Sequence, residues 1–192
     1  MDAGWSHFVG LRQDNTLVQW GNVLGAAPGG TFRAVSAGYD HSLAIRTDGT
    51  LIGWGDNSLG QASVPPGTFR AIAAGTRFSL GIREDGTLIG WGANNWGQTS
   101  VPSGEFVAVA AGWEFGLGLR TDGTLTAWGR NNHGQLNTPS GSYSAIDAGL
   151  FHGLAVVPSP GGLPMIALGA LVASRRRSDC WRLLSLPASA AL

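Results

Sequence analysis

Short apolar runs separated by turn residues recur along most of the chain. In one representative stretch, an apolar run at 43–45 precedes Asp48-Gly49, and a second run ends in Trp54-Gly55. A further apolar run, at 32–35, comes before these two. Strand-length runs bounded by Gly, Asn, Asp and Pro are typical of β-hairpins, and no helical periodicity occurs before the C-terminal tail. The pattern predicts an all-β fold with at least three short strands in each stretch.

The stretch is one unit of an internal repeat. Trp-Gly begins at 20, 54, 91 and 128, and Ala-Gly begins at 3, 37, 74, 111 and 148, so the period is 34 residues once and then 37. The copies are 3–36, 37–73, 74–110, 111–147 and a partial fifth at 148–157. A unit of this size buries its apolar face only against its neighbours. Residues 1–157 are therefore predicted to form a β-propeller of blades of about 37 residues, with four copies and a partial fifth.

The Asp-Gly pair suggests how the two strands of each hairpin meet. Asp-Gly suits a two-residue type I′ turn, and a turn centred on residues 48 and 49 pairs Leu43 with Trp54 and Ala44 with Gly53. One face of the hairpin would then be bulky and the other flat. We assign structural roles to the tryptophans of the Trp-Gly pairs and the glycines of the Asp-Gly pairs, which are Trp20, Trp54, Trp91, Trp128, Gly49, Gly86 and Gly123.

The run from Gly38 to Gln61, which reads Gly-x-x-His-Ser-Leu-Ala-Ile-Arg-Thr-Asp-Gly-Thr-Leu-Ile-Gly-Trp-Gly, resembles the regulator of chromosome condensation repeat family. Gln-x-x-Val-Pro at 61–65 and 98–102 is similar to the compact bacterial version, which includes secreted, propeller-shaped β-lactamase inhibitors. The resemblance implies about seven blades, so four copies and a partial fifth predict an incomplete or open propeller. A closed ring of four blades is the alternative. Because Met1 directly precedes the first Ala-Gly region, without the strand found before the others, we expect the chain to be a fragment of a longer propeller.

The composition changes after Val157. Residues 158–178 form a Pro/Gly linker, an apolar run at 163–173 and an Arg cluster at 175–177. An eleven-residue apolar run is shorter than the roughly 20 residues that a helix needs to cross a bilayer. The order is similar to a PEP-CTERM sorting signal, although Ser159 stands where that family usually has Glu. A frayed segment or a small docking helix is the alternative.

A sorting signal implies a sortase-like processing enzyme and transient membrane contact through residues 163–177. It also implies a location at the cell envelope or outside the cell. The N-terminal residues lack the basic and apolar regions of a signal peptide, so an exported form would need a longer N-terminus. Residues 179–192 have no assigned role.

Composition excludes several classes of site. Twelve basic residues, all Arg, balance twelve acids and form no basic cluster within the repeats, so we expect no nucleic-acid partner. The single Cys180 excludes an intrachain disulfide and a thiolate metal cluster. One repeat position is occupied by either His or Phe, which is typical of packing rather than of metal binding. Its occupants are His7, His41, Phe78, Phe115 and His152.

No residues have the pattern of a catalytic site. Most acids lie in turns or are scattered, and no nucleophile motif occurs. We therefore expect no enzyme activity, no catalytic residue, no metal and no cofactor.

The positions that vary within the regular repeat are the candidate binding residues, because the scaffold fixes the others. They follow each Ala-Gly pair or lie at the tips of the loops after Trp-Gly, and should line one rim. The selected residues are Trp5, Tyr39, Asp40, Arg77, Trp96, Trp113, Glu114 and His133. The equivalent positions also hold Leu59, Leu150 and Phe151.

Tryptophan and tyrosine are common interface anchors, although Trp5 and Trp113 have the alternative role of filling gaps between blades. The sequence predicts a non-catalytic binding scaffold for a protein partner or a glycan. The alternatives are an exchange-factor-like regulator of a small GTPase and a truncated gene product without independent function.

Overall fold

The computed structural model describes residues 1–22 and 24–158, which contain β-strands and no helix. The strands form antiparallel sheets in the orders β1-β2-β3, β4-β5-β6, β7-β8-β9, β10-β11-β12 and β13-β14. Their bounds are β1 Asp2–Ala3, β2 His7–Leu11, β3 Leu17–Gly21, β4 Phe32–Ala37, β5 His41–Arg46, β6 Leu51–Gly55, β7 Phe69–Ala74, β8 Phe78–Arg83, β9 Leu88–Gly92, β10 Phe106–Ala111, β11 Phe115–Arg120, β12 Leu125–Gly129, β13 Ala145–Ala148 and β14 Gly153–Val156. The prediction of an all-β fold with three-stranded units is confirmed.

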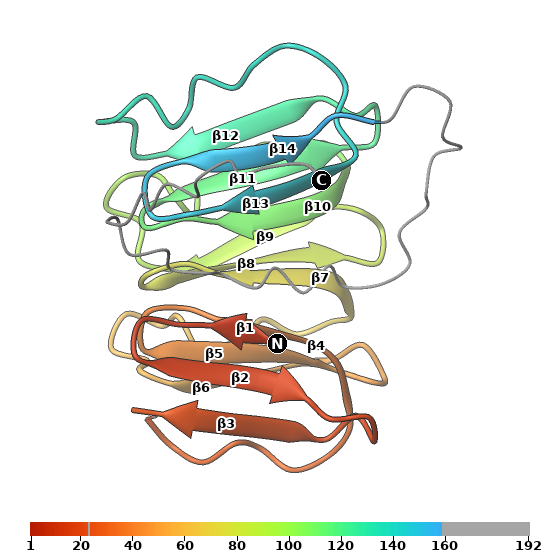
Figure 1. Ribbon diagram of the computed structural model, residues 1–192, viewed down its shortest axis with the longest axis vertical. Helices are drawn as coiled ribbons and strands as arrows, with labels where there is room; N and C mark the ends of the chain where they lie inside the picture. Colours follow the sequence, from red (N-terminus) through yellow and green to blue (C-terminus); the bar gives the residue numbers. More distant parts are fainter. Residues whose placement is uncertain (23, 159–192) are drawn as a thin grey trace, which may run out of the picture.

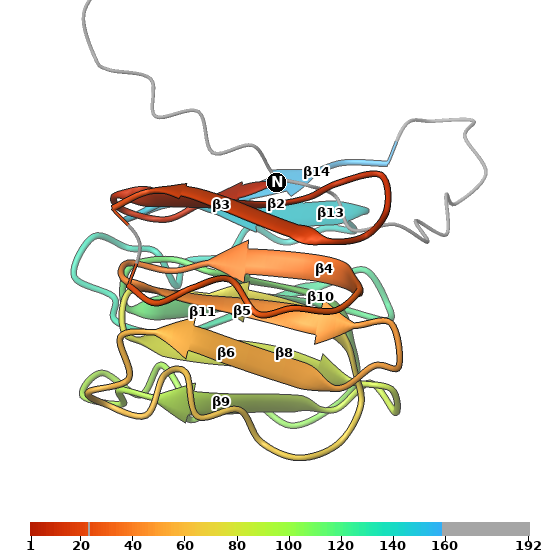
Figure 2. The same cartoon turned by 90° about the horizontal axis from the view of Figure 1, so that it is seen from below.

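The sheets follow one another in chain order (Figure 1). The first strands of successive sheets, β4, β7, β10 and β13, contact one another along the inside of the arrangement. Seen from below, β3 and β14 appear on one side and β9 on the opposite side (Figure 2). The sheets in the described part of the chain do not close into a ring, so they are blades of an open propeller, as predicted.

Two sequence predictions fall largely outside this description. The sorting-signal-like segment, apart from Pro158, and the 179–192 tail lie beyond the described residues. Within the described ranges, no helix is long and apolar enough to cross a membrane.

The hairpin turn differs from the predicted type I′ turn. The Arg46 N–H donates to the Thr50 carbonyl at 2.8 Å, and the Gly49 N–H donates to the Arg46 carbonyl at 2.9 Å. Gly49 has a φ of +89°, whereas Asp48 is not among the positive-φ residues. Its carboxylate accepts hydrogen bonds from both the backbone N–H and the hydroxyl of Thr50, at 2.9 and 2.7 Å. These features define a three-residue loop with a glycine bulge, so the predicted turn type was wrong.

The extra loop residue shifts the strand register by one position, which moves side chains to the other face. Trp54 therefore pairs with Ser42, and Leu43 pairs with Gly53, instead of the predicted Leu43–Trp54 pair. The tryptophans of the second, third and fourth sheets each lie beside a small residue on the same face, Ser or Gly. In the fourth sheet a Cβ on Gly116 would approach the Trp128 ring to 2.4 Å, so only a small residue lets the indole lie flat there.

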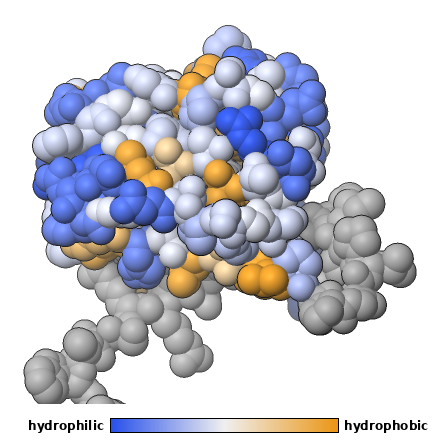
Figure 3. Space-filling view, turned by 90° about the horizontal axis from the view of Figure 1, so that it is seen from above, coloured by the Kyte–Doolittle hydropathy of each residue, from blue (hydrophilic) through white to orange (hydrophobic). Residues whose placement is uncertain are grey.

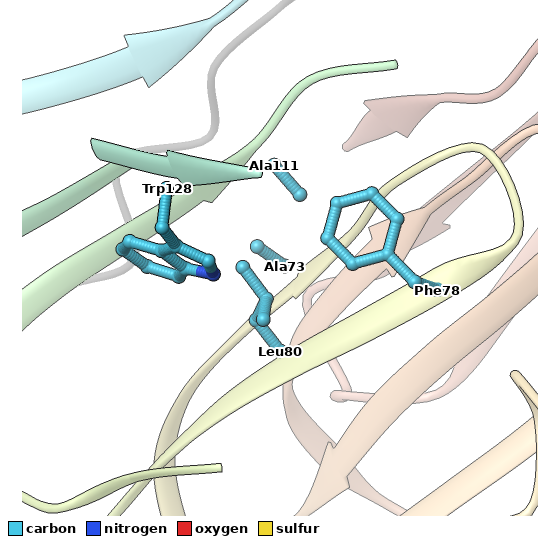
Figure 4. Packing of buried hydrophobic residues seen from close by; sticks show 5 residues of the cluster. All are labelled: Ala73, Phe78, Leu80, Ala111 and Trp128. Atoms are coloured by element: carbon cyan, nitrogen blue, oxygen red, sulfur yellow. The ribbon is translucent and has the colours of Figure 1, made fainter. Parts of the chain in front are cut away.

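The blade tryptophans fill the space between neighbouring sheets. Trp128 belongs to a buried cluster with Ala73, Phe78 and Leu80 of the preceding sheet (Figure 4). Its indole N–H donates to the Gln98 carbonyl at 2.9 Å. In the first sheet, Trp20 instead stacks on Phe8 at 5.2 Å and remains 43% exposed.

A second contact between sheets involves the repeat position that holds either His or Phe. His7 Nε2 lies 2.8 Å from Ser42 Oγ, and His41 Nε2 lies 2.9 Å from Ser79 Oγ. Both histidines are buried. Where the repeat has Phe78 or Phe115, the position equivalent to these serines holds glycine. The pairing of His with Ser and of Phe with Gly supports a packing role for this position.

Candidate binding rim

The loops that follow each Ala-Gly pair connect the inner strand of a sheet to its middle strand. Backbone hydrogen bonds of 3.1–3.3 Å join each loop to the loop of the next sheet. Their N–H donors and carbonyl acceptors are Trp5 to Tyr39, Tyr39 to Gly75, Thr76 to Trp113 and Trp113 to Leu150. The loops therefore form a continuous line across the sheets. We call these loops, together with the loop tips around Leu59, Trp96 and His133, the rim.

The first aromatic group of the rim is a pair. The rings of Trp5 and Tyr39 stack with centroids 5.0 Å apart and planes at 21°. Trp5 is 47% exposed. The neighbouring Asp40 is partly buried, and its backbone carbonyl accepts a hydrogen bond from the Asp56 N–H at 2.7 Å. The pair thus presents aromatic surface next to an acidic residue.

The second aromatic group lies at the other end of the rim. The Trp113 and Phe151 rings are 5.0 Å apart, and His133 meets the Phe151 ring edge-on at 4.9 Å. All three side chains are exposed. Phe151 was noted as a variable position but was not among the selected residues, because the sequence does not show that it contacts two of them.

A charged residue missed by sequence reasoning joins two rim residues. Arg130 forms an ion pair with Glu114 at 2.6 Å and places its guanidinium 4.7 Å from the centre of the Trp96 ring. Both members of the ion pair are largely shielded, with side-chain exposures of 27% and 25%. Arg130 directly follows a Trp-Gly pair, where the other copies have Asn22, Asp56 and Ala93. This variation between copies is the sequence feature that could have identified Arg130 as a rim residue.

A small hollow lies between these groups. Leu59, Arg77, Trp113 and Glu114 are among the residues that line it, so it joins loops from three copies of the repeat. Arg77 is exposed. A hydrogen bond from the Ser58 amide lowers the pKa of nearby Asp56, and the charge of Arg77 contributes to the same shift. The middle of the rim therefore carries ionised groups of both signs.

The structure thus brings together Trp5 with Tyr39, Trp96 with Glu114 through Arg130, and Trp113 with His133 through Phe151. Within residues 1–22 and 24–158, no group of three or more His, Cys, Asp and Glu side chains is placed to hold a metal ion. The rim offers aromatic surface, hydrogen-bonding groups and charge, which are the elements of a binding surface.

Comparison with known proteins identifies the repeat. The family model "Regulator of chromosome condensation (RCC1) repeat" matches residues 32–61, 69–98 and 106–135. The chain therefore contains RCC1-like repeats. No protein among the curated sequences matches it.

Solved structures share the architecture. The ectodomain of the Physcomitrella patens receptor kinase CR4 is 25% identical, with a TM-score of 0.70 over 84% of this chain and 48% of that one. The CRINKLY WD40 ectodomain of the Arabidopsis thaliana receptor kinase ACR4 is also 25% identical, with a TM-score of 0.68 over 81% and 59%. Prp20p from Saccharomyces cerevisiae is 16% identical, with a TM-score of 0.69 over 80% and 54%. The chain spans between 48% and 59% of the length of these structures.

Proposed function

We propose that this chain, an open arc of RCC1-like blades, is a non-catalytic scaffold that binds a protein partner through its rim. The observation that carries the proposal is the pair of aromatic groups, Trp5 with Tyr39 and Trp113 with Phe151, on either side of charged residues. The rings of each group already contact one another, stacked in the first and tilted by 34° in the second, and the loops beneath are hydrogen-bonded to one another. Preorganised side chains lose little entropy on binding, which favours affinity.

A protein partner fits the rim better than a glycan does. Exposed tryptophans next to Arg and Glu side chains are typical of protein interfaces, where aromatic anchors supply affinity and charges supply selectivity. Trp113 and Glu114 are adjacent in sequence, and Arg77 lines the same hollow. A partner with an apolar centre and charged groups of both signs would match this surface.

The proposed location is the cell envelope or the outside of the cell. Two structures at 25% identity are ectodomains of receptor kinases, so the architecture serves outside the cell in those proteins. The order of linker, apolar run and Arg cluster in residues 158–178 supports the same location. Processing by a sortase-like enzyme and transient membrane contact through 163–177 belong to this proposal.

An exchange-factor-like role has weaker support. Prp20p, which has binding properties to Gsp1p and histones, is 16% identical to this chain, a likeness that concerns the fold alone. No rim residue of this chain argues for a GTPase over another protein.

The test is capture of a partner by the immobilised full chain from an extracellular or envelope fraction. We expect a triple variant with Trp5→Ala, Tyr39→Ala and Trp113→Ala to lose at least about a hundredfold in affinity, because interface aromatics contribute about 2 kcal/mol or more each. Trp20→Ala is the matched control, because it removes a similarly exposed tryptophan away from the rim. Undiminished capture by the triple variant would refute the rim, and capture of no partner by the wild type would favour a product without independent function.

A further inference from the structure

Within the described residues, one edge of the last sheet is unpaired. In the sheet before it, the middle strand β11 lies between β10 and β12. Strand β14 occupies the equivalent middle position and pairs with β13 on one side. Among residues 1–22 and 24–158, no strand pairs with its other side. A row of backbone groups along a strand edge is a template for pairing with another extended segment.

The repeat shows which backbone groups face this edge. The Arg120 N–H donates to the Thr124 carbonyl, and the Arg130 N–H donates to the Glu114 carbonyl. Hydrogen-bonding direction alternates along an antiparallel strand, so the residues of β11 that bond to β12 are the even-numbered ones. Their equivalents 37 positions later are Gly153 and Ala155, which direct their N–H and C=O groups to the open edge.

A hollow adjoins the edge at the position where the other sheets hold tryptophan. In the preceding sheet, Trp128 pairs with Gly116 and donates to the Gln98 carbonyl. It shares a buried cluster with Leu80 (Figure 4), and Leu88 packs against that cluster. The equivalents of these partners line a hollow of about 320 Å³ beside β14. We call them the tryptophan socket, and they are Leu117, Leu125, Gln135 and Gly153.

The next part of the sequence lacks the residues that the repeat has in its third strand. The positions equivalent to Leu125, Thr126, Ala127 and Trp128 are Gly, Leu, Pro and Met at 162–165. Proline cannot donate to a strand ladder, and the tryptophan is replaced. We therefore expect another molecule to supply a strand whose side chains fit the socket.

We propose that the open edge of β14 binds an extended segment of a partner protein with the pattern Leu-x-x-Trp-Gly. The segment pairs antiparallel with β14, which supplies main-chain hydrogen bonds, and its indole enters the tryptophan socket. The indole N–H then donates to the Gln135 carbonyl, as Trp128 does to Gln98. A third strand would also stabilise a two-stranded sheet, which is marginal alone.

The surface around this edge agrees with a docking role. Figure 3 views the molecule from the end where β12 and β14 lie and shows separate apolar patches among hydrophilic side chains. Leu154 is 57% exposed, whereas its equivalent Leu117 is 3% exposed. This site is distinct from the proposed function of the rim, although Phe151 and His133 border both.

The probe is a fluorescein-labelled peptide with the chain's own strand sequence, Asp-Gly-Thr-Leu-Thr-Ala-Trp-Gly, titrated against the full 192-residue chain by fluorescence anisotropy. The control peptide replaces its Trp by Ala. We expect the Trp peptide to bind about tenfold or more tightly, because a buried aromatic anchor contributes about 2 kcal/mol. Absence of binding, or equal affinity of the two peptides, would overturn the proposal. This test uses the wild-type chain and so does not depend on the folding of any variant.

Two protein variants locate the bound peptide. Ala155→Pro removes an N–H that faces the open edge and leaves the pairing with β13 in place, so it should abolish binding. Val107→Ser is the matched control, because Val107 is an exposed strand residue that does not line the hollow, and it should bind normally. Circular dichroism checks that both variants fold. Normal binding by Ala155→Pro would overturn the site. If the chain associates with itself and this association prevents peptide binding, the edge binds a second copy of the chain. That result would also overturn the proposal of a partner protein. The triple rim variant should bind the peptide normally, which separates this test from that of the rim.

Discussion

Replacing His41 by Phe should be less destabilising at pH 5 than at pH 8. His41 is 1% exposed, its Nε2 contacts Ser79 Oγ, and its Nδ1 has no hydrogen-bond partner. Burial lowers the pKa of His41 to about 4, and the charge of His7 contributes. The unfolded chain has a pKa of 6.5 at this residue, so it binds the proton first. Stability from neutral His41 is therefore present above pH 6.5 and is lost as the pH falls toward 4.

The magnitude follows from these two pKa values. At pH 5 the unfolded state gains about 2 kcal/mol from protonating this histidine, since one pKa unit corresponds to about 1.4 kcal/mol. Phenylalanine cannot be protonated, so the variant does not lose this 2 kcal/mol of folding stability at pH 5. The substitution also removes the hydrogen bond to Ser79, which costs about 1 kcal/mol, although Ser79 keeps its bond to the Gln61 carbonyl. The packing of Phe against Ser79 and the lost hydrogen bond act alike at both pH values, so the stability of His41→Phe relative to wild type should rise by about 2 kcal/mol between pH 8 and pH 5.

Urea unfolding at both pH values, followed by circular dichroism, measures this difference. Phe115→Leu is the control, because Phe115 occupies the same repeat position without a titratable group, so its replacement should shift stability alike at both pH values. The same difference between wild type and His41→Phe at pH 8 and pH 5 would refute the argument that buried His41 stays neutral.

Two further predictions concern the repeat itself. Trp128→Ala should cost about 3–5 kcal/mol in the free energy of unfolding, whereas Trp20→Ala, at the same repeat position but 43% exposed, should cost less than about 1 kcal/mol; equal losses in urea unfolding would contradict the packing described. Gly86 has a φ of +87°, so Gly86→Ala should cost about 1 kcal/mol, and Gly86→Asn should cost less because Asn15 adopts a φ of 64° at the equivalent turn. Thermal unfolding that ranks Ala above Asn would disprove the turn geometry.

The strands were predictable because two sequence features indicate each of them. Each strand contains an apolar run, and each recurs at the same position of the repeat. Phe32–Ala37 and the equivalent strands of later copies lie where the sequence placed a strand before each Ala-Gly. The turn was not predicted correctly because Asp-Gly is compatible with two loop lengths. Thr50 decides between them, since its N–H and hydroxyl bind the Asp48 carboxylate and draw it into the loop.

The rim was predictable only as a set of variable positions. The sequence shows that Trp113 and Phe151 vary, but their ring contact depends on how two neighbouring sheets pack. Arg130 was missed for the same reason, because its contacts with Trp96 and Glu114 join residues that are distant in sequence. Lateral packing between blades is a property of the folded arc and is absent from the pattern of a single repeat.

The most direct measurement of the binding role is amide hydrogen exchange of the full chain with and without its captured partner. We expect slowed exchange in the loops that follow the Ala-Gly pairs, at residues 5–6, 39–40, 76–77 and 113–114, with the outer strands β3, β6 and β9 unchanged. Slowed exchange along those outer strands, with no change in the loops, would contradict binding through the rim.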